Sequence, residues 1–470
     1  LSIFAQGEYG ARDTVRLVSN ASGKFGPVGL SLGGGYTNTD GISAFSGGTE
    51  RDGYRQYSAN GRIEIELAEN MRLETSGYYA DSRVDNDSVF PPFSSESTQF
   101  SLAEEFYGNI ALVADAFDGR FRNRFAFSIA DINRQIISPL FTSLPQGRTE
   151  RYEYRGDFEW NDKLRFIFGT EVEDSRYENT GVSDSTGINS VFLQAVVKPI
   201  KGLSLTAGVR HDEHDDFGGN TSFAGNLVYL FGDNGPTIRA SYAEGFRAPS
   251  LIDLDGRFFG FGTPDLLPET AKSYDLGIEH SFADGALQLS LTAFQRDTRN
   301  QIAFAPCPAL PALAPDVCTN GSRPFGTTQN IENTRSRGIE AIVTLNPAKG
   351  FRIDANYTYL DTQNRSQGAN FGNKLARRPS SSLYLGASYE TSFGLNLAGD
   401  IQMVGNSFDD LANGRQIDGY ILAGARVSMP VTDNIEFFGR IENLFDENYA
   451  TATDFGTLGR SAYAGVRARF

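Results

Sequence analysis

The chain has few of the residues that build several common kinds of site. Its 470 residues include 2 Cys, 3 Met, 1 Trp and 3 His. Catalysis by a Ser-His or Asp-His pair has few candidates, because His211, His214 and His280 lie in no recognisable catalytic motif. Cys307 and Cys318 share one Pro-rich segment that contains no further Cys or His, which favours a disulfide over a zinc site. We therefore predict that the protein is not an enzyme and has no resident cofactor beyond a loop-bound cation.

Long hydrophobic runs and an excess of positive charge are also missing. A membrane-spanning helix needs about 20 consecutive apolar residues, whereas apolar stretches such as 110–113 are soon broken by Gly or charge. Residues 1–10 lack the basic start and apolar core of a secretory signal. With 58 acidic against 42 basic residues the formal charge is −16, so the protein's field repels nucleic acid. Acidic loops can instead hold divalent cations, including those that bridge lipopolysaccharide, or form an ordinary solvated surface.

The chain is rich in segments that alternate apolar and polar residues with period two, the pattern of a strand with one apolar and one wet face. Clear examples cover residues 63–67, 203–210, 287–293 and 351–359, and the last segment, 462–470, alternates until it stops on Phe. The alternation often persists for about 10 residues, enough to cross a bilayer at a tilt, whereas strands in soluble proteins are usually about 5 to 6 residues long. We predict an all-β fold, a transmembrane antiparallel up-and-down β-barrel.

Connections of two lengths alternate along the chain, as they do in outer-membrane barrels with short periplasmic turns and long outer loops. A large transporter barrel of 22 strands leaves roughly 21 residues for each strand and its connection, which fits this chain. The prediction is therefore a single barrel domain over residues 1–470. Short turns are expected at 68–70, 118–119, 161–162, 201–202, 233–235, 284–285, 348–350 and 432–434, and long loops at 81–97, 138–148, 255–267, 305–325, 363–377 and 406–416.

Charged residues on the wet face are predicted to line the barrel lumen, because their neighbours at odd spacing are apolar and must face lipid. Opposite charges there can pair, and such a lining suits either a polar plug or a water-filled channel. The expected lumenal residues are Glu64, Glu66, Arg120, Arg122, Arg124, Arg165, Arg210, Arg239, Arg352, Arg440, Glu442, Arg467 and Arg469.

Two motifs in the middle of the chain carry a family resemblance. The segment YAEGFRAPSLIDL (242–254), followed by TPDLLPETAKSYDLGIE (263–279), resembles the mid-barrel signature of TonB-dependent receptors. Further matches follow in the order that this family shows: NIENTRSRGIEA (330–341), YTYLDTQN (357–364), LARRPSSSLYLG (375–386) and RIENLFDENY (440–449). The resemblance implies a nutrient receptor in the outer membrane of a Gram-negative bacterium, in contact with membrane lipid and lipopolysaccharide, and we expect a monomer.

The start of the sequence departs from that family. TonB-dependent receptors begin with a globular plug that fills the lumen and carries the TonB box, whereas this chain opens in strand-like sequence at 4–10. We therefore predict no N-terminal plug domain in this chain, so that TonB could act only through a plug that it does not contain. Two interpretations stay open: a receptor whose plug was removed or omitted, and a plugless passive diffusion channel.

The substrate class follows from a second resemblance. The run 33–67 is similar to the first hairpins of vitamin B12 receptors, which implies cobalamin, with ferric siderophores as the alternative. Because such receptors can bind calcium through loop aspartates, Asp81, Asp85 and Asp87 are candidate ligands within one predicted loop, although an EF-hand spacing is missing and a solvated loop is the alternative. Loop aromatics are the candidate nutrient contacts, or else loop and membrane anchors: Phe90, Phe93, Phe258, Phe259, Phe261, Phe304 and Phe408.

One further cluster of possible metal ligands occurs at 211–217. His211, Asp212, His214 and Asp215 could assemble a transition-metal site. Residues three apart in a strand face opposite sides, however, so both histidines could meet one ion only if the loop bends back. An ordinary acidic hairpin is the preferred interpretation.

Overall fold

The computed structural model describes residues 1–88, 94–139, 141–254, 262–306 and 326–470. Its strands and two short helical elements follow one another along the chain as β1 (Ser2–Gly10), β2 (Thr14–Phe25), β3 (Val28–Ile42), β4 (Asp52–Ala68), β5 (Met71–Ser88), β6 (Ser95–Ala116), β7 (Phe121–Ile137), β8 (Thr142–Ser143), β9 (Gln146–Asn161), β10 (Leu164–Asn179), β11 (Val182–Val197), β12 (Leu203–His214), β13 (Gly218–Leu230), β14 (Thr237–Arg247), α1 (Leu251–Leu254), β15 (Glu269–Phe282), η1 (Ala283–Gly285), β16 (Leu287–Pro306), β17 (Gly326–Ala348), β18 (Phe351–Asn364), β19 (Ser381–Glu390), β20 (Asn396–Val404), β21 (Ser407–Phe408), β22 (Gln416–Ile417), β23 (Tyr420–Pro430), β24 (Ile435–Glu442) and β25 (Ser461–Arg469).

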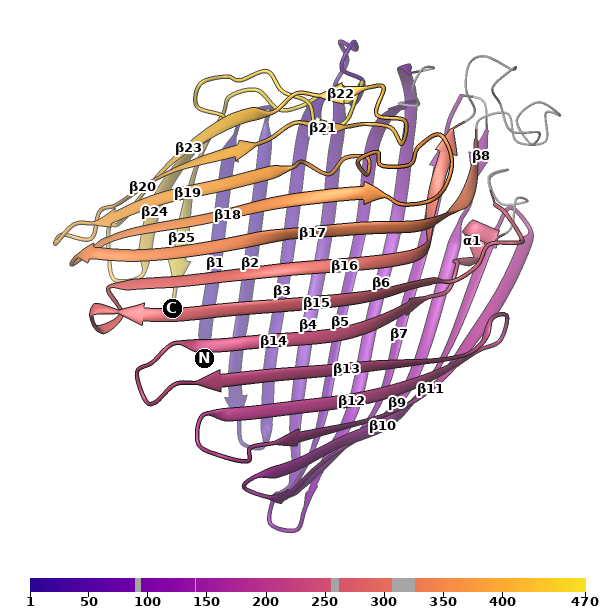
Figure 1. The fold of residues 1–470 in the computed structure, drawn as a ribbon. Coiled ribbons are helices and arrows are strands. Elements are labelled where there is room, and N and C mark those ends of the chain that lie inside the picture. The colour runs from indigo at the N-terminus through magenta and orange to yellow at the C-terminus, as the bar shows by residue number, and fades with distance from the viewer. Residues whose placement is uncertain (89–93, 140, 255–261, 307–325) are drawn as a thin grey trace.

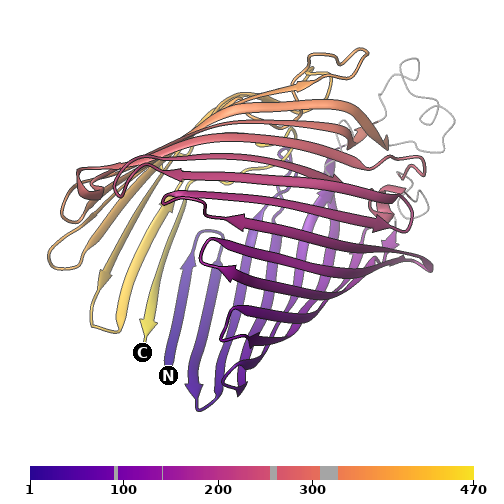
Figure 2. The same cartoon turned by 60° about the horizontal axis from the view of Figure 1, so that its bottom comes forward.

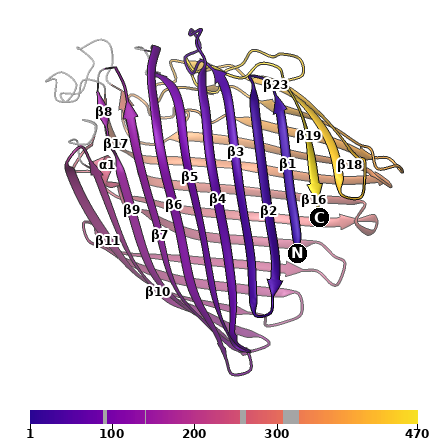
Figure 3. The ribbon, with the colours of Figure 1, turned by 180° about the vertical axis from the view of Figure 1, so that it is seen from behind.

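The strands form one closed antiparallel barrel, which confirms the predicted fold class (Figure 1). Within the described residues, 22 strands make up the wall, as expected. The two-residue strand β8 pairs only with the end of β7, and β21 pairs with β22 in a separate hairpin. Each wall strand pairs with its neighbour in sequence, and Figure 3 shows β1 to β11 side by side in this order. None of the helices in the described segments is long and apolar enough to span a membrane.

The first and last strands close the barrel. Seven register pairs join β1 to β25, from Phe4 opposite Arg469 to Gly10 opposite Tyr463. Beyond them, the backbone N–H of Ile3 donates to the carbonyl of Phe470 at 2.7 Å, and the N–H of Phe470 donates back at 2.8 Å. The two termini therefore lie side by side at one end of the barrel (Figure 2). This pairing leaves no free sheet edge, which a strand inside lipid could not tolerate.

The two ends of the barrel differ in their connections. Short turns such as 69–70, 162–163 and 349–350 lie at the end that holds the termini, and the connecting residues 248–254, 262–268, 365–380, 405–419 and 443–460 lie at the opposite end. By the rule for outer-membrane barrels, the second end is the extracellular one. The predicted loop at 81–97 was placed wrongly, because β5 runs on to Ser88 and β6 starts at Ser95. Outside the lipid both faces of a strand contact water, so apolar and polar residues no longer alternate, although the hydrogen-bonded pairing of the strands continues.

Register identifies the face that each residue takes. Along β10, Val172, Asp174, Arg176 and Glu178 are exposed, whereas the residues between them are partly occluded by the concave interior. The exposed face continues across neighbouring strands as an apolar belt. Tyr152 of β9 lies opposite Val172 of β10, and Tyr79 of β5 lies opposite Phe106 of β6. The exposed Tyr57 of β4 belongs to the same belt. We call this the outer face and the other the lumenal face. Within the belt, apolar residues therefore take the outer face, as predicted, whereas beyond it the outer face also carries charge.

Candidate functional site

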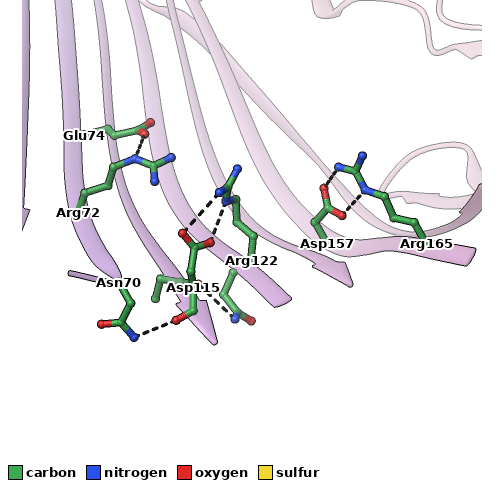
Figure 4. A network of polar contacts seen from close by, with 9 residues as sticks. Asn70, Arg72, Glu74, Asp115, Arg122, Asp157 and Arg165 are labelled. Carbon is green, nitrogen blue, oxygen red and sulfur yellow. Dashed lines mark hydrogen bonds and ion pairs between the residues drawn. The ribbon is translucent and has the colours of Figure 1, made fainter. Parts of the chain in front are cut away.

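The lumenal face carries charge along its whole height, and these charges pair both within strands and across them. Near the end with the short turns, Arg72 pairs with Glu74 at 2.8 Å, Arg122 with Asp115 at 2.8 Å, and Arg165 with Asp157 (Figure 4). These pairs come from β5, β6, β7, β9 and β10, so they follow one another around the wall. Each of these arginines has a carboxylate of its own, which holds the long side chains against the wall.

Similar pairing occurs higher in the lumen. The Nη2 and Nε atoms of Arg210 donate to Glu171 Oε2 and Asp212 Oδ1, both at 2.7 Å, and the Ser190 hydroxyl donates to the same Asp212 oxygen at 2.7 Å. Arg440 reaches across β25 and binds both oxygens of Glu8 at 2.8 and 3.0 Å, so the seam between the first and last strands is bridged by an ion pair. Fork-like contacts of this kind are the strong form of Arg–carboxylate bonding.

Most of the predicted lumenal charges have partners on this face. The pairs are Glu64 with Arg62, Glu66 with Lys24, Arg124 with Glu153, Arg239 with Glu279, Arg352 with Asp354, Arg440 with Glu442 and Arg467 with Glu436. Arg469 lies over the ring of Phe4 at 5.8 Å. Arg120 departs from the prediction: it lies in the turn after β6, where its guanidinium donates to the Glu159 and Trp160 carbonyls, so it belongs to the rim.

Most of the predicted nutrient contacts and both cysteines lie outside the described residues. This holds for Phe90, Phe93, Phe258, Phe259 and Phe261, and for the predicted disulfide of Cys307 and Cys318. Phe304 lies in β16 rather than in a loop and is exposed, and Phe408 lies half-buried in the β21–β22 hairpin above the barrel. Contact of either ring with a nutrient stays a prediction.

The three aspartates predicted as calcium ligands are separated by the fold. All of them lie in β5 and not in a loop. Asp85 pairs with Arg83 at 2.8 Å, and Asp81 lies opposite Glu104 on the outer face. Asp87 alone is buried, and it joins two carboxylates that sequence reasoning missed.

Those two carboxylates, Glu50 and Asp52, form an acidic cluster with Asp87. One oxygen from each residue lies within 4.8 Å of the others. Asp52 starts β4, Asp87 is the last residue but one of β5, and Glu50 belongs to the connection after β3. Only strand register therefore brings the three together. A sequence signal did exist, since acidic residues recur near the ends of consecutive hairpins, but it does not specify the partners.

Backbone and side-chain donors hold this acidic cluster in place. Asp87 accepts hydrogen bonds from the N–H groups of Phe45 at 2.8 Å and Ser97 at 2.7 Å, and Asp52 accepts from Ala44 N–H at 2.6 Å. Glu50 differs, because its Oε1 is buried without a hydrogen-bond donor. Its protonated form can hydrogen-bond to Glu96, and this contact, together with burial and the contact with Asp87, raises the pKa of Glu50 to about 7. Either a proton or a cation therefore suits the space beside Glu50.

The histidines of the 211–217 segment do not converge. His211 lies on the outer face, where its Nδ1 is 2.8 Å from the Thr221 hydroxyl. His214 is buried, and its Nδ1 accepts a hydrogen bond from Asp216 N–H at 3.1 Å. Among the residues that the structure describes, the acidic cluster is the only group of three or more His, Cys, Asp or Glu close enough to hold a metal ion. The preferred interpretation of this hairpin as an ordinary acidic one is consistent with this arrangement.

Comparison with known proteins relates this architecture to one family. The sequence model of the "TonB dependent receptor-like, beta-barrel" family matches residues 4–444. The vitamin B12 transporter BtuB of Photobacterium profundum is 27% identical over 452 residues, which cover 92% of this chain and 68% of that protein. The ferric enterobactin receptor of Pseudomonas aeruginosa is 25% identical over 62% of this chain, which spans only 44% of the length of that receptor.

Solved structures agree on the fold. A ferric enterobactin receptor of Pseudomonas aeruginosa, PfeA, superposes with a TM-score of 0.81 at 17% identity, over 100% of this chain and 81% of the other. The copper transporter OprC gives 0.80 at 13% identity, again over 100% of this chain and 80% of the other. At such identities the likeness concerns the fold alone. Together with the match over residues 4–444, it shows that the chain belongs to the TonB-dependent receptor β-barrel family, whose barrels cross the outer membrane of Gram-negative bacteria with their strands.

Proposed function

We propose that this barrel belongs to a TonB-dependent receptor that takes up a scarce nutrient, a cobalamin or a ferric siderophore, across the outer membrane. The observation that carries the proposal is the match of 92% of the chain to a vitamin B12 transporter. The lumen supports it, because a wall of paired charges offers a polar path through the lipid. No bond is made or broken in this scheme: the extracellular end collects the nutrient and the lumen delivers it.

In this proposal the energy for release comes from TonB, acting through a plug domain as the family resemblance implies. The barrel works as a monomer surrounded by outer-membrane lipid and lipopolysaccharide. Its relatives carry the names of transporters and receptors, which do not favour the alternative of a passive diffusion channel.

Uptake measurements test the proposal. The complete gene is expressed in a strain that lacks its own cobalamin and enterobactin receptors, and accumulation of radiolabelled cyanocobalamin and of ferric enterobactin is followed with and without TonB. We expect accumulation of one of the two, and its loss without TonB. Accumulation that persists without TonB, together with a steady open conductance of the purified protein in a planar bilayer, would establish the passive channel instead.

We also propose that the acidic cluster of Glu50, Asp52 and Asp87 binds calcium. Hard carboxylate oxygens are the ligands that this ion takes, and the donor-free Glu50 oxygen supports the idea. Calorimetric titration of the purified protein with calcium should give binding that weakens strongly in Asp87→Asn. The matched control is Asp85→Asn, which removes a neighbouring carboxylate outside the cluster. Equal binding by both variants and the wild type would eliminate this site.

A further inference from the structure

The outer face carries a band of charge directly above its apolar belt on the extracellular side. On β14 to β17 this band is self-neutralising. Glu244 lies opposite Lys272, Lys272 opposite Asp297, and Asp297 opposite Arg335. The contacts are short, with Lys272 Nζ at 3.1 Å from Glu244 Oε1 and Arg335 Nε at 2.6 Å from Asp297 Oδ1. We call these four residues the complementary row.

The same band on β4 to β10 has the opposite arrangement. Arg55 of β4 lies directly opposite Arg83 of β5, and Arg148 of β9 lies directly opposite Arg176 of β10. We call these four residues the arginine pairs. One step closer to the belt, acidic residues also meet acidic residues, Asp81 opposite Glu104 and Glu150 opposite Asp174. Like charges that face each other across a strand pair destabilise a sheet, so the isolated protein bears a cost here.

In each arginine pair, a nearby carboxylate binds only one of the two guanidinium groups. Arg83 binds Asp85 at 2.8 Å and Arg148 binds Glu150 at 2.8 Å through its Nε atom. Within the described segments, the guanidinium groups of Arg55 and Arg176 have neither an ion pair nor a hydrogen bond, and both side chains are exposed. Among the described residues, each arginine pair therefore has one guanidinium without a carboxylate partner, and that of Arg55 lies over the Tyr57 ring at 5.9 Å.

The arginine pairs also lie where lipid headgroups would lie. Tyr57 lies two residues along β4 from Arg55, and Tyr152 lies four residues along β9 from Arg148. The two rings are 49% and 51% exposed and belong to the apolar belt. Tyrosines at this level mark the boundary between acyl chains and headgroups. Arg55 and Arg83, with Arg51 and Asp40, also line a surface hollow of about 450 Å³. The surface is therefore recessed where its unpaired cation lies.

We propose that the arginine pairs bind the phosphate groups of an anionic, phosphorylated lipid of the outer leaflet, on the β4–β10 side of the barrel only. Guanidinium groups hold phosphate oxygens through two parallel N–H donors, and one phosphate between two facing arginines removes their repulsion. The two guanidinium groups without a carboxylate partner and their continuity with the lipid-facing belt identify the occupant. The proposal rests on the outer-membrane placement but not on the identity of the nutrient.

The test uses the protein produced from its complete gene and purified in a neutral detergent. Lipid A with both phosphates is added to one sample, dephosphorylated lipid A to a second and inorganic phosphate to a third, and bound ligand is counted by native mass spectrometry. We expect the phosphorylated lipid to bind at least about tenfold more tightly than either of the others, because charge-assisted contacts dominate. Equal binding of dephosphorylated lipid, or equal binding of inorganic phosphate, would overturn the proposal.

Two double variants locate the site. Arg148→Gln with Arg176→Gln removes one arginine pair, and Lys272→Gln with Arg335→Gln removes the same two positive charges from the complementary row. Binding of phosphorylated lipid A should fall by about tenfold in the first variant and stay unchanged in the second. Unchanged binding in the first, or an equal loss in both, would contradict the assignment. Nutrient uptake is measured separately in cells, so failure of this test leaves the transport proposal unaffected.

Discussion

The complementary row and the arginine pairs both lie on the extracellular side of the apolar belt of one sheet, yet their charges meet in opposite ways. Along the complementary row every charge faces its opposite, so these four residues neutralise one another. On β4 to β10 arginine faces arginine. Both patterns use ordinary charged residues, and both follow an apolar belt. The difference shows that strand register, rather than composition, decides whether the charges of a wall neutralise one another or need partners from outside the protein.

The largest effect is expected from reversing the middle charge of the complementary row. Lys272→Glu would place three carboxylates in line, because Glu244 and Asp297 flank this position. Losing two favourable cross-strand contacts and gaining two repulsive ones should lower the free energy of unfolding by about 2 kcal/mol. Chemical denaturation in detergent measures it. Lys272→Gln is the control and should lose about half as much stability. An unchanged denaturation midpoint in Lys272→Glu would show that the complementary row does not contribute to stability.

A smaller change in stability, of opposite sign, is expected when one charge of the arginine pairs is reversed. Arg176→Glu would put a carboxylate opposite Arg148, so in lipid-free detergent it should raise the free energy of unfolding by about 1 kcal/mol. Arg335→Glu, the matched change in the complementary row, should lower it. If both variants shift in the same direction, the contrast between the two sides does not exist.

The acidic cluster is a third place where like charges meet, again on the β4–β6 side. Because the pKa of Glu50 is raised to about 7, its protonated form stabilises the fold; this contribution is complete below about pH 4.5 and is lost as the pH rises through 7. Without divalent cations, the melting temperature of the wild type should therefore fall relative to that of Glu50→Gln between pH 5 and pH 8. Added calcium should remove this difference at pH 8. Parallel curves for the two proteins at all pH values would refute the shift.

The smallest effect is expected from salt. Raising the ionic strength from about 0.1 M to about 1 M shortens the screening length from about 10 Å to about 3 Å. Both the penalty in Lys272→Glu and the gain in Arg176→Glu should shrink, by a few tenths of a kcal/mol each. Denaturation midpoints at the two ionic strengths measure the change. Effects that do not respond to salt would arise from packing instead of charge.

The sequence predicted the wall well, because one property controls it. Ile63 and Ile65 must contact lipid while Glu64 between them must not, so alternation alone identified strands, faces and the closed barrel. It could not find the ends of the strands outside the lipid, where no apolar face is needed, and this is why Asp81 and Asp85 were assigned to a loop.

The acidic cluster and the charge rows were beyond that reasoning for a different reason. Asp87 was identified as a candidate ligand, but its partners Glu50 and Asp52 belong to other segments. Alternation tells which side of the sheet a residue faces, but it does not tell which residue of the neighbouring strand lies opposite it. The facing residue depends on the length of every turn, and a shift by two residues would exchange Arg176 for a carboxylate neighbour of Arg148 without altering the alternation.

The hydrogen bonds between Ile3 and Phe470 have a consequence for how the molecule forms. The contact that completes the cylinder joins the first and last strands of the barrel, so the ring cannot close until β25 has been added. Every earlier intermediate exposes two unsatisfied edges, and closing so large a loop is slow. Assembly of this protein should therefore be limited by its last step, and loss of a few C-terminal residues should leave an open, sticky sheet rather than a smaller barrel.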